Sequence, residues 1–579
     1  MMLDDFQRAA ATTRANRVVV PAAAGSGKTT TLVARITFMV EELHIHPKSI
    51  VVITFTRYAA RSMKQKLGRL GKRLGYLGTI HAWLLNVLKE HGRPLGWEGD
   101  WLTILDEQEA EAEMETALIG AGLKSRRGEW TGCRAGEWDA FLRLTFQGDK
   151  DSLDALGFGS GDFGKLAKMK AAMGAYMLRL RAENAMTFDM IISEAHALLK
   201  SNPAALSAVR GSVSHLLVDE VQDTDDRQWD IIDMIAPDSL YVVGDVDQSL
   251  YSWRGARPRK MIDLALSDDV TVLFLPKSYR FGHDIAQHAN RLIGHNKDRL
   301  ALTIRAAGVS EDVAVMESAS GDALYESVME DVAKSKCGGG DVCVLARTHA
   351  ALETVADKFR YHKIKYDYPG SKDDICKTVQ HRIVKGLLRL MNNPDDKRGF
   401  VCLLPALDLP DARLLELREE SVATGKSMFS LLGREDILPA KVSDVATQAS
   451  ILCPRMVWNE EAEFIDKVQL AEGFTKAQDM LNHFAMASLQ DSMASADKRD
   501  KPTLSTIHGA KGLEWPIVYL IGMNEGVMPS AKSMTSGNED EERRCAYVGM
   551  TRAQKKLKMV HMESDRTPER SRFLNESTG

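Results

Sequence analysis

The sequence lacks the features of a secreted, membrane-spanning or disulfide-stabilised protein. No apolar run approaches the roughly 18 residues that are needed to span a bilayer. The N-terminus, from Met1 to Asp5, has neither the basic start nor the apolar core of a secretion signal. The seven cysteines include no Cys-x-x-Cys pair, which argues against a zinc site or a disulfide framework. We therefore expect a soluble protein of a reducing cytoplasm, with no membrane partner.

A strong excess of one charge is also missing. The chain has 75 basic and 80 acidic residues and a formal net charge of −5. This balance neither favours nor excludes a nucleic-acid ligand, because a local basic surface can lie in a mildly acidic protein. A hydrophobic fraction of 44% is typical of globular proteins. At 579 residues the chain is too long to fold around a single hydrophobic core, and we expect about four domains or subdomains.

Short β-branched runs, each ending at small or polar residues, predict buried parallel strands separated by helices. They are Arg17–Val20, Ser49–Thr54, His215–Asp219, Leu240–Gly244, Val270–Leu275, Asp341–Arg347, Ile517–Gly522 and Leu557–His561. Two long stretches, at about 84–200 and 377–500, carry the amphipathic and charge-rich pattern of helices instead. The sequence therefore predicts two α/β domains, each interrupted by a helical insertion.

These patterns also predict the domain boundaries. The first α/β domain comprises residues 1–83 and 191–270, with its helical insertion at 84–190. The second α/β domain comprises residues 271–377 and 501–579, with its insertion at 378–500. Each α/β domain is thus expected to form from two separate stretches of chain.

A phosphate-binding loop follows the first predicted strand. It consists of Ala22, Ala23, Ala24, Gly25, Ser26, Gly27, Lys28 and Thr29. Small residues let the backbone N–H groups of such a loop approach and cradle phosphates at the start of the next helix. In this pattern Lys28 reaches the β- and γ-phosphates, and the Thr29 hydroxyl binds Mg²⁺. The sequence therefore predicts binding and hydrolysis of ATP with Mg²⁺.

The predicted strand His215–Asp219 ends in two adjacent carboxylates, Asp219 and Glu220. One carboxylate of such a pair can bind the metal ion while the other activates the attacking water. We assign Asp219 as a metal ligand and Glu220 as the general base. An isolated Asp-Glu pair at a strand end is more often only solvated, but the phosphate loop upstream favours the catalytic interpretation.

Residues 244–255 combine a possible phosphate contact with aromatic side chains. Gln248 can contact a γ-phosphate and its water, and Tyr251, Trp253 and Arg254 follow within six residues. Stacking of a base on such rings and guanidinium planes contributes about 1–3 kcal/mol and tolerates any base. The segment predicts a nucleotide sensor joined to a platform for single strands, although Tyr251 and Trp253 alone could equally be core aromatics.

Together these motifs resemble those of the UvrD/Rep/PcrA family of superfamily 1A DNA helicases over nearly the whole chain. The segments that carry the resemblance are Leu3–Gln7, Ala22–Thr29, Thr54–Thr56, Gly78–His81, Leu217–Thr224, Gly244–Ala256, Leu275–Arg280, Thr503–Gly522 and Glu539–Ala553. The resemblance implies two RecA-like P-loop NTPase domains in tandem, each with a mainly helical insertion. It also implies ATP-dependent translocation on single-stranded DNA and 3′-to-5′ unwinding of tailed duplexes, in repair, recombination or replication.

The resemblance assigns roles to individual residues. Gln7 would read adenine, Tyr279 would stack on it, and Glu514 would bind the ribose. Arg280 and Arg552 of the second domain would contact the transferring phosphoryl group, beside Gln248 of the first. The implied DNA contacts are Phe55, Thr56, His81, Tyr251, Trp253, Arg254 and His508.

Several departures from the family pattern affect these expectations. Thr30 stands where the family has an arginine that packs on adenine, which predicts a looser base pocket. The second insertion is shorter than is usual for the family, the long C-terminal tail that family members use for partners is missing, and no nuclease domain follows. An alternative is therefore a DNA-sensing ATPase subunit of a repair or defence complex, acting with a partner nuclease. An inactive relative is disfavoured, because every catalytic residue type is present.

Two charged runs have no role in these assignments. The basic segment Lys64–Arg73 could contact phosphates or could equally be a solvated helix face followed by a turn. The acidic run Asp106–Glu115 predicts an exposed helix face. The expected location of the whole protein is the bacterial cytoplasm or a phage-infected cell, on the nucleoid through its DNA.

Overall fold

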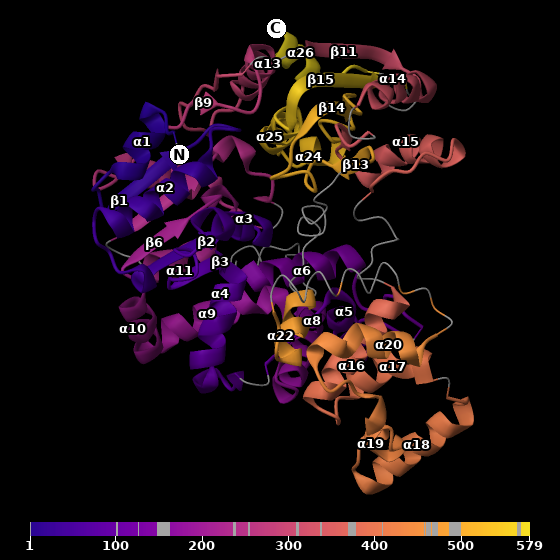
Figure 1. Ribbon diagram of the computed structural model, residues 1–579. Helices are drawn as coiled ribbons and strands as arrows, with labels where there is room; N and C mark the ends of the chain where they lie inside the picture. The colour runs from indigo at the N-terminus through magenta and orange to yellow at the C-terminus, as the bar shows by residue number, and fades with distance from the viewer. Residues whose placement is uncertain are drawn as a thin grey trace.

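The structure is a computed structural model of the chain, and Figure 1 shows its arrangement. The described residues are 2–99, 102–125, 127–147, 163–235, 239–252, 255–308, 312–335, 339–368, 378–407, 409–454, 456, 458, 465, 473–485, 500–563 and 569–579. Within them the chain forms two α/β units and two helical insertions.

The first α/β unit is built on a sheet of six parallel strands. Their spatial order is β3 (Tyr76–Thr79), β2 (Ile50–Thr54), β6 (His215–Val218), β7 (Leu240–Gly244), β1 (Arg17–Pro21) and β8 (Thr271–Val272). The central strands are almost wholly buried and rich in valine, isoleucine and leucine, as parallel strands covered on both faces require. Because the strands are parallel, the loops after β1, β2, β6 and β7 meet at one edge of the sheet.

Helices cover both faces of this sheet. On one face α1 (Asp5–Thr12), α2 (Lys28–Glu41) and α3 (Arg57–Leu67) pack on alternate strand residues such as Val18 and Val20. On the other face, helices pack on strand residues such as Val19 and Ile53. Its helices are α4 (Ile80–His91), α9 (Phe188–Ser201), α10 (Pro203–Ser212), α11 (Asp226–Ile235) and α12 (Pro258–Ala265).

The second α/β unit has a sheet of five parallel strands. Their order is β11 (Asp312–Ala319), β15 (Ala553–Met562), β14 (Trp515–Ile521), β12 (Val342–Ala346) and β13 (Thr503–Thr506). The helices are α13 (His283–Ile293), α14 (Gly321–Lys334), α15 (His349–Tyr361), α24 (Ala531–Thr535), α25 (Glu539–Met550) and α26 (Arg572–Thr578). A short parallel pair, β9 (Lys277–Ser278) with β10 (Arg305–Ala306), lies in the connection between the units.

The tandem α/β architecture predicted from the sequence is confirmed, with one correction to a boundary. Strand β8 pairs with β1, and the N–H of Leu275 donates to the carbonyl of Pro21 at 2.8 Å. The first unit therefore continues to about Leu275, so the predicted division between residues 270 and 271 falls just before its last strand. The other predicted boundaries stay predictions.

The two helical insertions differ in how they are built. The first contains α5 (Glu107–Gly120), α6 (Ala135–Gln147), α8 (Phe163–Ala182) and the strand pair β4 (Thr103–Leu105) with β5 (Ala185–Thr187). Its buried side chains join one continuous core with a face of the first sheet. The second has a separate core. Its helices are α16 (Val379–Asn392), α17 (Lys397–Leu407), α18 (Asp411–Thr424), α19 (Met428–Leu432), α20 (Val445–Leu452) and α22 (Ala477–Ala485).

The second insertion docks on the first, as α22 and α16 beside α5 in Figure 1 indicate. Acidic residues of α5 and its N-cap pair with cations of α16 and α17. The pairs are Asp106 with Lys385, Glu109 with Arg389 at 2.7 Å, and Glu113 with Arg398 at 2.9 Å. The prediction that this acidic run is an exposed face is therefore wrong for these three residues. Their partners lie far away in the sequence, where a local pattern cannot show them.

Candidate active site

The phosphate loop connects β1 to α2 at the edge of the first sheet. The N–H of Ala22 donates to the carbonyl of Gly244 at 2.8 Å, which continues the sheet pairing into the loop. Gly25 and Gly27 have φ angles of 75° and 78°, in the left-handed region that glycine adopts without strain. The loop delivers Lys28 as the first residue of α2.

A segment that leads into the second unit packs directly against this loop. The N–H of Tyr279 donates to the carbonyl of Gly25 at 2.9 Å. A Cβ atom on Gly25 would lie 2.6 Å from Cβ of Arg280 and 2.6 Å from Oγ of Ser278. Position 25 therefore needs glycine for its backbone angle and also for this close approach.

Lys28 lies among carboxylates of the first sheet. Its Nζ lies 3.0 Å from Oε1 of Glu220. Burial opposes the charge of Lys28, but Glu220, Asp245 and Asp219 together raise its pKa above the usual value. Burial, with the neighbouring charge of Glu220, raises the pKa of Asp219 to about 7. Burial acts on Glu220 in the same direction, but Lys28 and Lys511 prevail and lower its pKa to about 2.

A hydrogen-bonded chain of side chains extends from Glu220 to Gln248. Gln222 donates to Oε2 of Glu220 at 2.6 Å and accepts from the N–H of Asp245 at 3.0 Å. Asp245 in turn accepts from Nε2 of Gln248 at 2.5 Å. Burial and the nearby Asp247 raise the pKa of Asp245 to about 7. Gln222 and Asp245 were not predicted as site residues, although both lie in segments that resemble the helicase family.

The second unit adds two arginines to this network. Nη2 of Arg552 donates to Oε1 of Gln248 at 3.1 Å. Nε of Arg280 lies 2.5 Å from Oε2 of Glu514, so Glu514 forms an ion pair with Arg280 in this structure. Burial and the charge of Arg280 lower the pKa of Arg552 to about 9. The six predicted catalytic residues therefore converge from both α/β units.

The residues predicted to hold the base lie beside the loop, with Gln7 on α1 and Tyr279 directly after β9. Nε2 of Gln7 donates to the carbonyl of Ser26 at 3.0 Å, and Oε1 accepts from the N–H of Asp4 at 3.2 Å. Tyr279 is 47% exposed and donates its hydroxyl to Asp4 at 2.5 Å. Thr30 is half-buried on α2. Both ends of the Gln7 amide thus already have protein partners.

The predicted DNA contacts divide into two ring clusters. Phe55 stacks on Tyr251 with ring centroids 5.2 Å apart, and the edge of His508 approaches Tyr251 at 6.2 Å. His81 stacks instead on Phe188 of α9, with centroids 3.8 Å apart. Burial, with nearby cations, lowers the pKa of His508 to about 4, so this ring is neutral at physiological pH.

Of the remaining predicted contacts, the structure describes Thr56, which follows Phe55 in the sequence. Thr56 caps α3, because its Oγ1 accepts the N–H of Ala59 at 3.1 Å. Trp253 and Arg254 lie outside the described residues, so their contacts stay predictions.

A buried lysine of the second unit connects the nucleotide residues to the aromatic rings. Lys511 donates to the carboxylate of Asp223 and, at 2.8 Å, to the carbonyl of Gln248. The same Nζ lies 4.9 Å from the ring centroid of Tyr251 and 5.8 Å from that of Phe55, within the range of a cation–π contact. Four groups of the first unit thus contact one ammonium of the second.

Comparison with known proteins identifies the family. The model of the UvrD/REP helicase N-terminal domain matches residues 3–267, and the model of the UvrD-like helicase C-terminal domain matches residues 458–564. Together the two models cover more than half of the chain. The chain belongs to the UvrD/Rep helicase family.

Relatives in this family are similar to the chain over nearly the whole of its length. The chain is 26% identical to the ATP-dependent DNA helicase PcrA of Leuconostoc citreum, over 99% of this chain and 84% of that protein. It is 27% identical to the ATP-dependent DNA helicase Rep of Escherichia coli strain K12, over 96% and 91%. It is 25% identical to PcrA of Staphylococcus aureus, over 96% and 83%. As a family member, the chain is a helicase with two RecA-like domains.

Lys511 and Asp223 are residues of this helicase that the sequence analysis did not assign. Both lie in segments that carry the family resemblance, and Lys511 is the lysine three residues after His508. The position of Lys511 close to His508, in a segment that carries the resemblance, was the sequence signal that could have marked it as a site residue. It could not show that Lys511 reaches another domain, since its partner Asp223 is 288 residues away.

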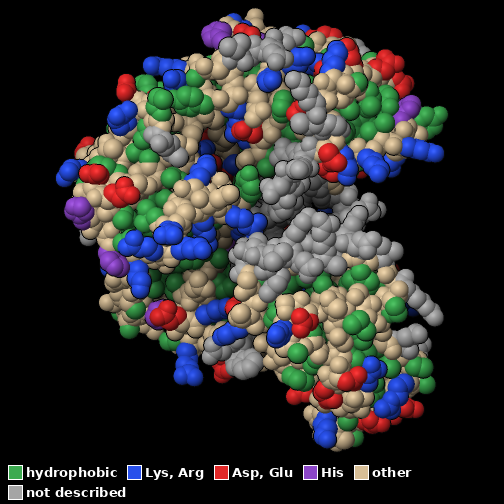
Figure 2. All heavy atoms as spheres, in the orientation of Figure 1, with side chains coloured by type: hydrophobic (Ala, Val, Ile, Leu, Met, Phe, Trp, Pro, Cys, Tyr) green, Lys and Arg blue, Asp and Glu red, His purple; other side chains and the backbone are tan. Residues whose placement is uncertain are grey.

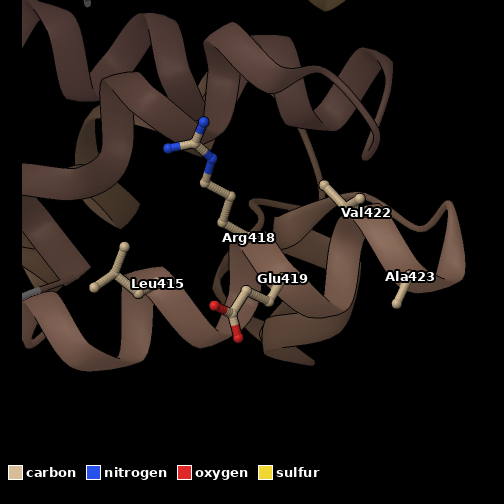
Figure 3. Close-up of a pocket in the computed structure, with 5 residues that line it drawn as sticks. All are labelled: Leu415, Arg418, Glu419, Val422 and Ala423. Atoms are coloured by element: carbon tan, nitrogen blue, oxygen red, sulfur yellow. The ribbon is translucent and has the colours of Figure 1, made fainter.

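A surface hollow elsewhere in the helicase has a different character. It is lined by Leu415, Arg418, Glu419, Val422 and Ala423, all from α18 of the second insertion (Figure 3). One face of a single helix lines it, and none of the predicted nucleotide or DNA residues contributes. This hollow therefore adds nothing to the candidate active site.

Two further searches covered the described part of the chain. It contains no cluster of three or more His, Cys, Asp or Glu side chains arranged to hold a metal ion. Its helices include none that is long and apolar enough to cross a membrane.

Proposed function

We propose that this helicase is an ATP-driven translocase on single-stranded DNA that unwinds tailed duplexes from 3′ to 5′. The observation that carries the proposal is the division of the site. Lys28, Asp219 and Glu220 lie on the first RecA-like domain, and Arg280 and Arg552 lie on the second. ATP bound between these groups would draw the two domains together, because its phosphates would attract cations of both.

The chemistry proposed for the site is an in-line attack of water on the γ-phosphate. Glu220 would accept the proton of the attacking water, and its lowered pKa keeps it ionised for that task. Arg280 and Arg552 would stabilise the charge that develops on the transferring phosphoryl group. Gln248, held between Asp245 and Arg552, would report the state of the γ-phosphate.

The proposed metal is Mg²⁺, held by the hydroxyl of Thr29 and the carboxylate of Asp219. Both are oxygen donors, and Mg²⁺ prefers a few such ligands together with substrate phosphates and waters. When bound, Mg²⁺ would neutralise phosphate charge. The ATP phosphates would lie against the loop residues Ala22–Thr29, whose glycines at positions 25 and 27 already have the required backbone angles.

Base recognition is proposed to be weak. Gln7 would read adenine only after giving up its bonds to Ser26 or Asp4, and Thr30 offers no guanidinium to the base. Tyr279 would stack on the base, and Glu514 would bind the ribose after leaving Arg280. We therefore expect GTP to be used nearly as well as ATP.

On the DNA side, we propose that a single strand crosses both domains over the aromatic cluster. Phe55, Tyr251 and His508 lie at the domain contact, and Thr56 lies beside them. His81 would contact the strand further along the first domain, and Trp253 and Arg254 would continue the platform beyond Tyr251. Stacking on such rings does not depend on base identity, as a translocase requires.

Lys511 is proposed as the residue that couples the two sites. Its ammonium would leave Asp223 and the Phe55–Tyr251 pair whenever the domains separate, because it belongs to the second domain. Each cycle of domain closure would then restore the contact between Lys511 and the rings proposed to hold DNA. Lys511 is a positioning residue in this scheme, since its contacts are with Asp223, Gln248 and the two rings.

The test is ATP-dependent separation of duplexes that carry either a 3′ or a 5′ single-stranded tail. Unwinding only from 5′ tails would reverse the proposed polarity. DNA-stimulated ATP hydrolysis without unwinding, with unwinding restored by a co-purifying nuclease, would support the alternative of an ATPase subunit in a repair or defence complex. A pull-down from the bacterial cytoplasm, the proposed location, would identify partners in repair, recombination or replication.

A further inference from the structure

The first domain contains a long stretch of chain without acidic residues. Between Leu43 and Lys89 the sequence has no Asp or Glu, although acidic residues outnumber basic ones in the whole chain. The same stretch has nine lysines and arginines. They are Lys48, Arg57, Arg61, Lys64, Lys66, Arg69, Lys72, Arg73 and Lys89.

Five of these cations form an exposed group, which we name the α3 basic surface. It consists of Lys64, Lys66, Arg69, Lys72 and Arg73, at the end of α3 and in the turn before β3. All five side chains are exposed, and within the described residues none of them forms a salt bridge. In Figure 2, Lys and Arg side chains gather across the area where Figure 1 draws α3, β2 and β6.

Helix stability accounts for only part of this surface. Lys64 and Lys66 lie in the last turn of α3, where cations interact favourably with the helix dipole. Arg69, Lys72 and Arg73 lie beyond Gly68, which ends the helix, so the dipole does not explain them. Unpaired like charges repel one another, and a cluster that the fold does not need points to an anionic ligand.

The position of the surface relates it to the proposed DNA site. Helix α3 begins directly after Phe55 and Thr56 and has 11 residues. At a rise of 1.5 Å per residue, it extends about 16 Å from the aromatic cluster to the basic turn. A strand that leaves Phe55 and follows α3 would therefore reach Arg69 and Lys72 within a few nucleotides.

We propose that the α3 basic surface binds the phosphate backbone of single-stranded DNA that continues past the Phe55–Tyr251 pair. The proposal rests on the proposed function, which supplies the strand. The surface offers flexible point charges, with no exposed ring among its five members, so it would hold phosphates without reading bases. It would thereby lengthen the footprint of the motor on the strand.

The proposal has a quantitative signature. For single strands, each phosphate contact steepens the fall of log K with log salt by about 0.7. Four lost contacts would reduce the slope by about 2.8, which corresponds to roughly a 50-fold change in relative affinity between 50 and 200 mM salt.

The experiment compares two lengths of oligothymidylate on one variant. The variant carries Lys64→Glu, Arg69→Glu, Lys72→Glu and Arg73→Glu. A control with the same change in net charge carries Lys168→Glu, Lys170→Glu, Lys426→Glu and Lys441→Glu, at exposed sites on the helical insertions. An oligomer of about 4 nucleotides covers only the aromatic site, and one of about 25 nucleotides reaches the surface.

The expected result is a selective loss. The variant should bind the long oligomer at least tenfold more weakly at low salt and with a reduced salt slope, while the short oligomer binds as in the wild type. The control should retain both affinities. A matching set of glutamine substitutions, checked by its thermal midpoint, separates loss of contact from charge repulsion and misfolding.

Two outcomes would overturn the proposal. The variant and the control could bind the long oligomer equally well, or the loss could be confined to fully duplex DNA, which would make duplex the occupant. A failure of the proposed function is distinguishable, because the wild type would then show no ATPase stimulation by the short oligomer.

Discussion

Two contact regions of this helicase use buried charges in opposite ways. At the nucleotide site, Lys28 faces three carboxylates, two of which have a pKa raised to about 7. At the contact between the helical insertions, each acid is paired with a cation of the other insertion, as Glu109 is with Arg389 at 2.7 Å. The first region is incompletely neutralised by the protein alone, whereas the second is complete.

The difference indicates what each region is for. An ionised group that is buried without a full set of partners destabilises the fold, so such a group is kept only where something else completes it. The proposed Mg²⁺ would supply that completion at the nucleotide site, because it would bind the carboxylate of Asp219. The insertion contact needs no ligand, and its pairs hold one insertion on the other.

Removal of Arg552 is expected to have the largest effect. Arg552→Ala should lower DNA-stimulated ATP turnover by about 10³- to 10⁵-fold, because its guanidinium would stabilise the transferring phosphoryl group. Glu220→Gln should lower turnover by about 10²- to 10⁴-fold while ATP still binds. Steady-state hydrolysis and binding of a fluorescent ATP analogue measure the two effects. Turnover within tenfold of the wild type for Arg552→Ala would remove this residue from the catalytic set.

At the insertion contact, loss of one partner should act on stability instead. Arg389→Ala would leave Glu109 and Asp396 without their buried cation and should destabilise the docked insertions by about 3 kcal/mol. Thermal unfolding and hydrogen exchange across α5 and α16 measure the change. Arg413→Ala, at an exposed arginine of α18, is the control and should leave both unchanged. Equal midpoints for the two variants would contradict the assigned difference.

Substitution of Lys511 tests whether ATP hydrolysis at the nucleotide site is coupled to DNA binding at the aromatic cluster. Lys511→Ala should reduce the ratio of ATPase rates with and without single-stranded DNA by about tenfold, because the rings lose their contact with the nucleotide side. Lys511→Arg should restore part of the ratio. An unchanged ratio, together with a lower melting temperature, would show that the residue is only structural.

The last expected effect is a pH dependence of stability that arises from a buried histidine beside the insertion contact. Burial, with the charges of Arg57 and Arg61, lowers the pKa of His483 to about 3. The unfolded chain binds a proton near pH 6.5 that the folded chain excludes, so stability is lost as pH falls. Between pH 7 and 5 the loss is about 2 kcal/mol for this residue. His483→Gln should flatten the pH profile of unfolding, whereas His283→Gln, at an exposed site, should leave its slope as in the wild type.

The sequence sufficed where the signal is local. A strand followed by Gly-Lys-Thr specified the loop and Lys28, and an apolar strand before Asp219 specified its edge of the sheet. The structure places Lys28 within hydrogen-bonding distance of Glu220, as the motifs indicated. The catalytic roles themselves stay predictions.

Features were missed where the local pattern is weak or where the interacting residues are distant in the sequence. Strand β3 has only four residues, one of them Gly78, and gives too weak a pattern to predict. The pairing of Glu109 with Arg389 spans 280 residues, so α5 looked like a solvated face. Lys511 escaped notice for the same reason, because its role depends on two domains meeting.

Gly25 limits how closely the two domains can approach each other. The loop and the Arg280 segment touch only because position 25 lacks a side chain, since a single added carbon would collide with both Arg280 and Ser278. A methyl group at position 25 would push the Arg280 segment of the second domain away from the phosphate loop of the first. It would keep the two domains apart without removing any charged group, and it would also strain the loop backbone at its φ of 75°, so both ATP binding and domain closure would weaken.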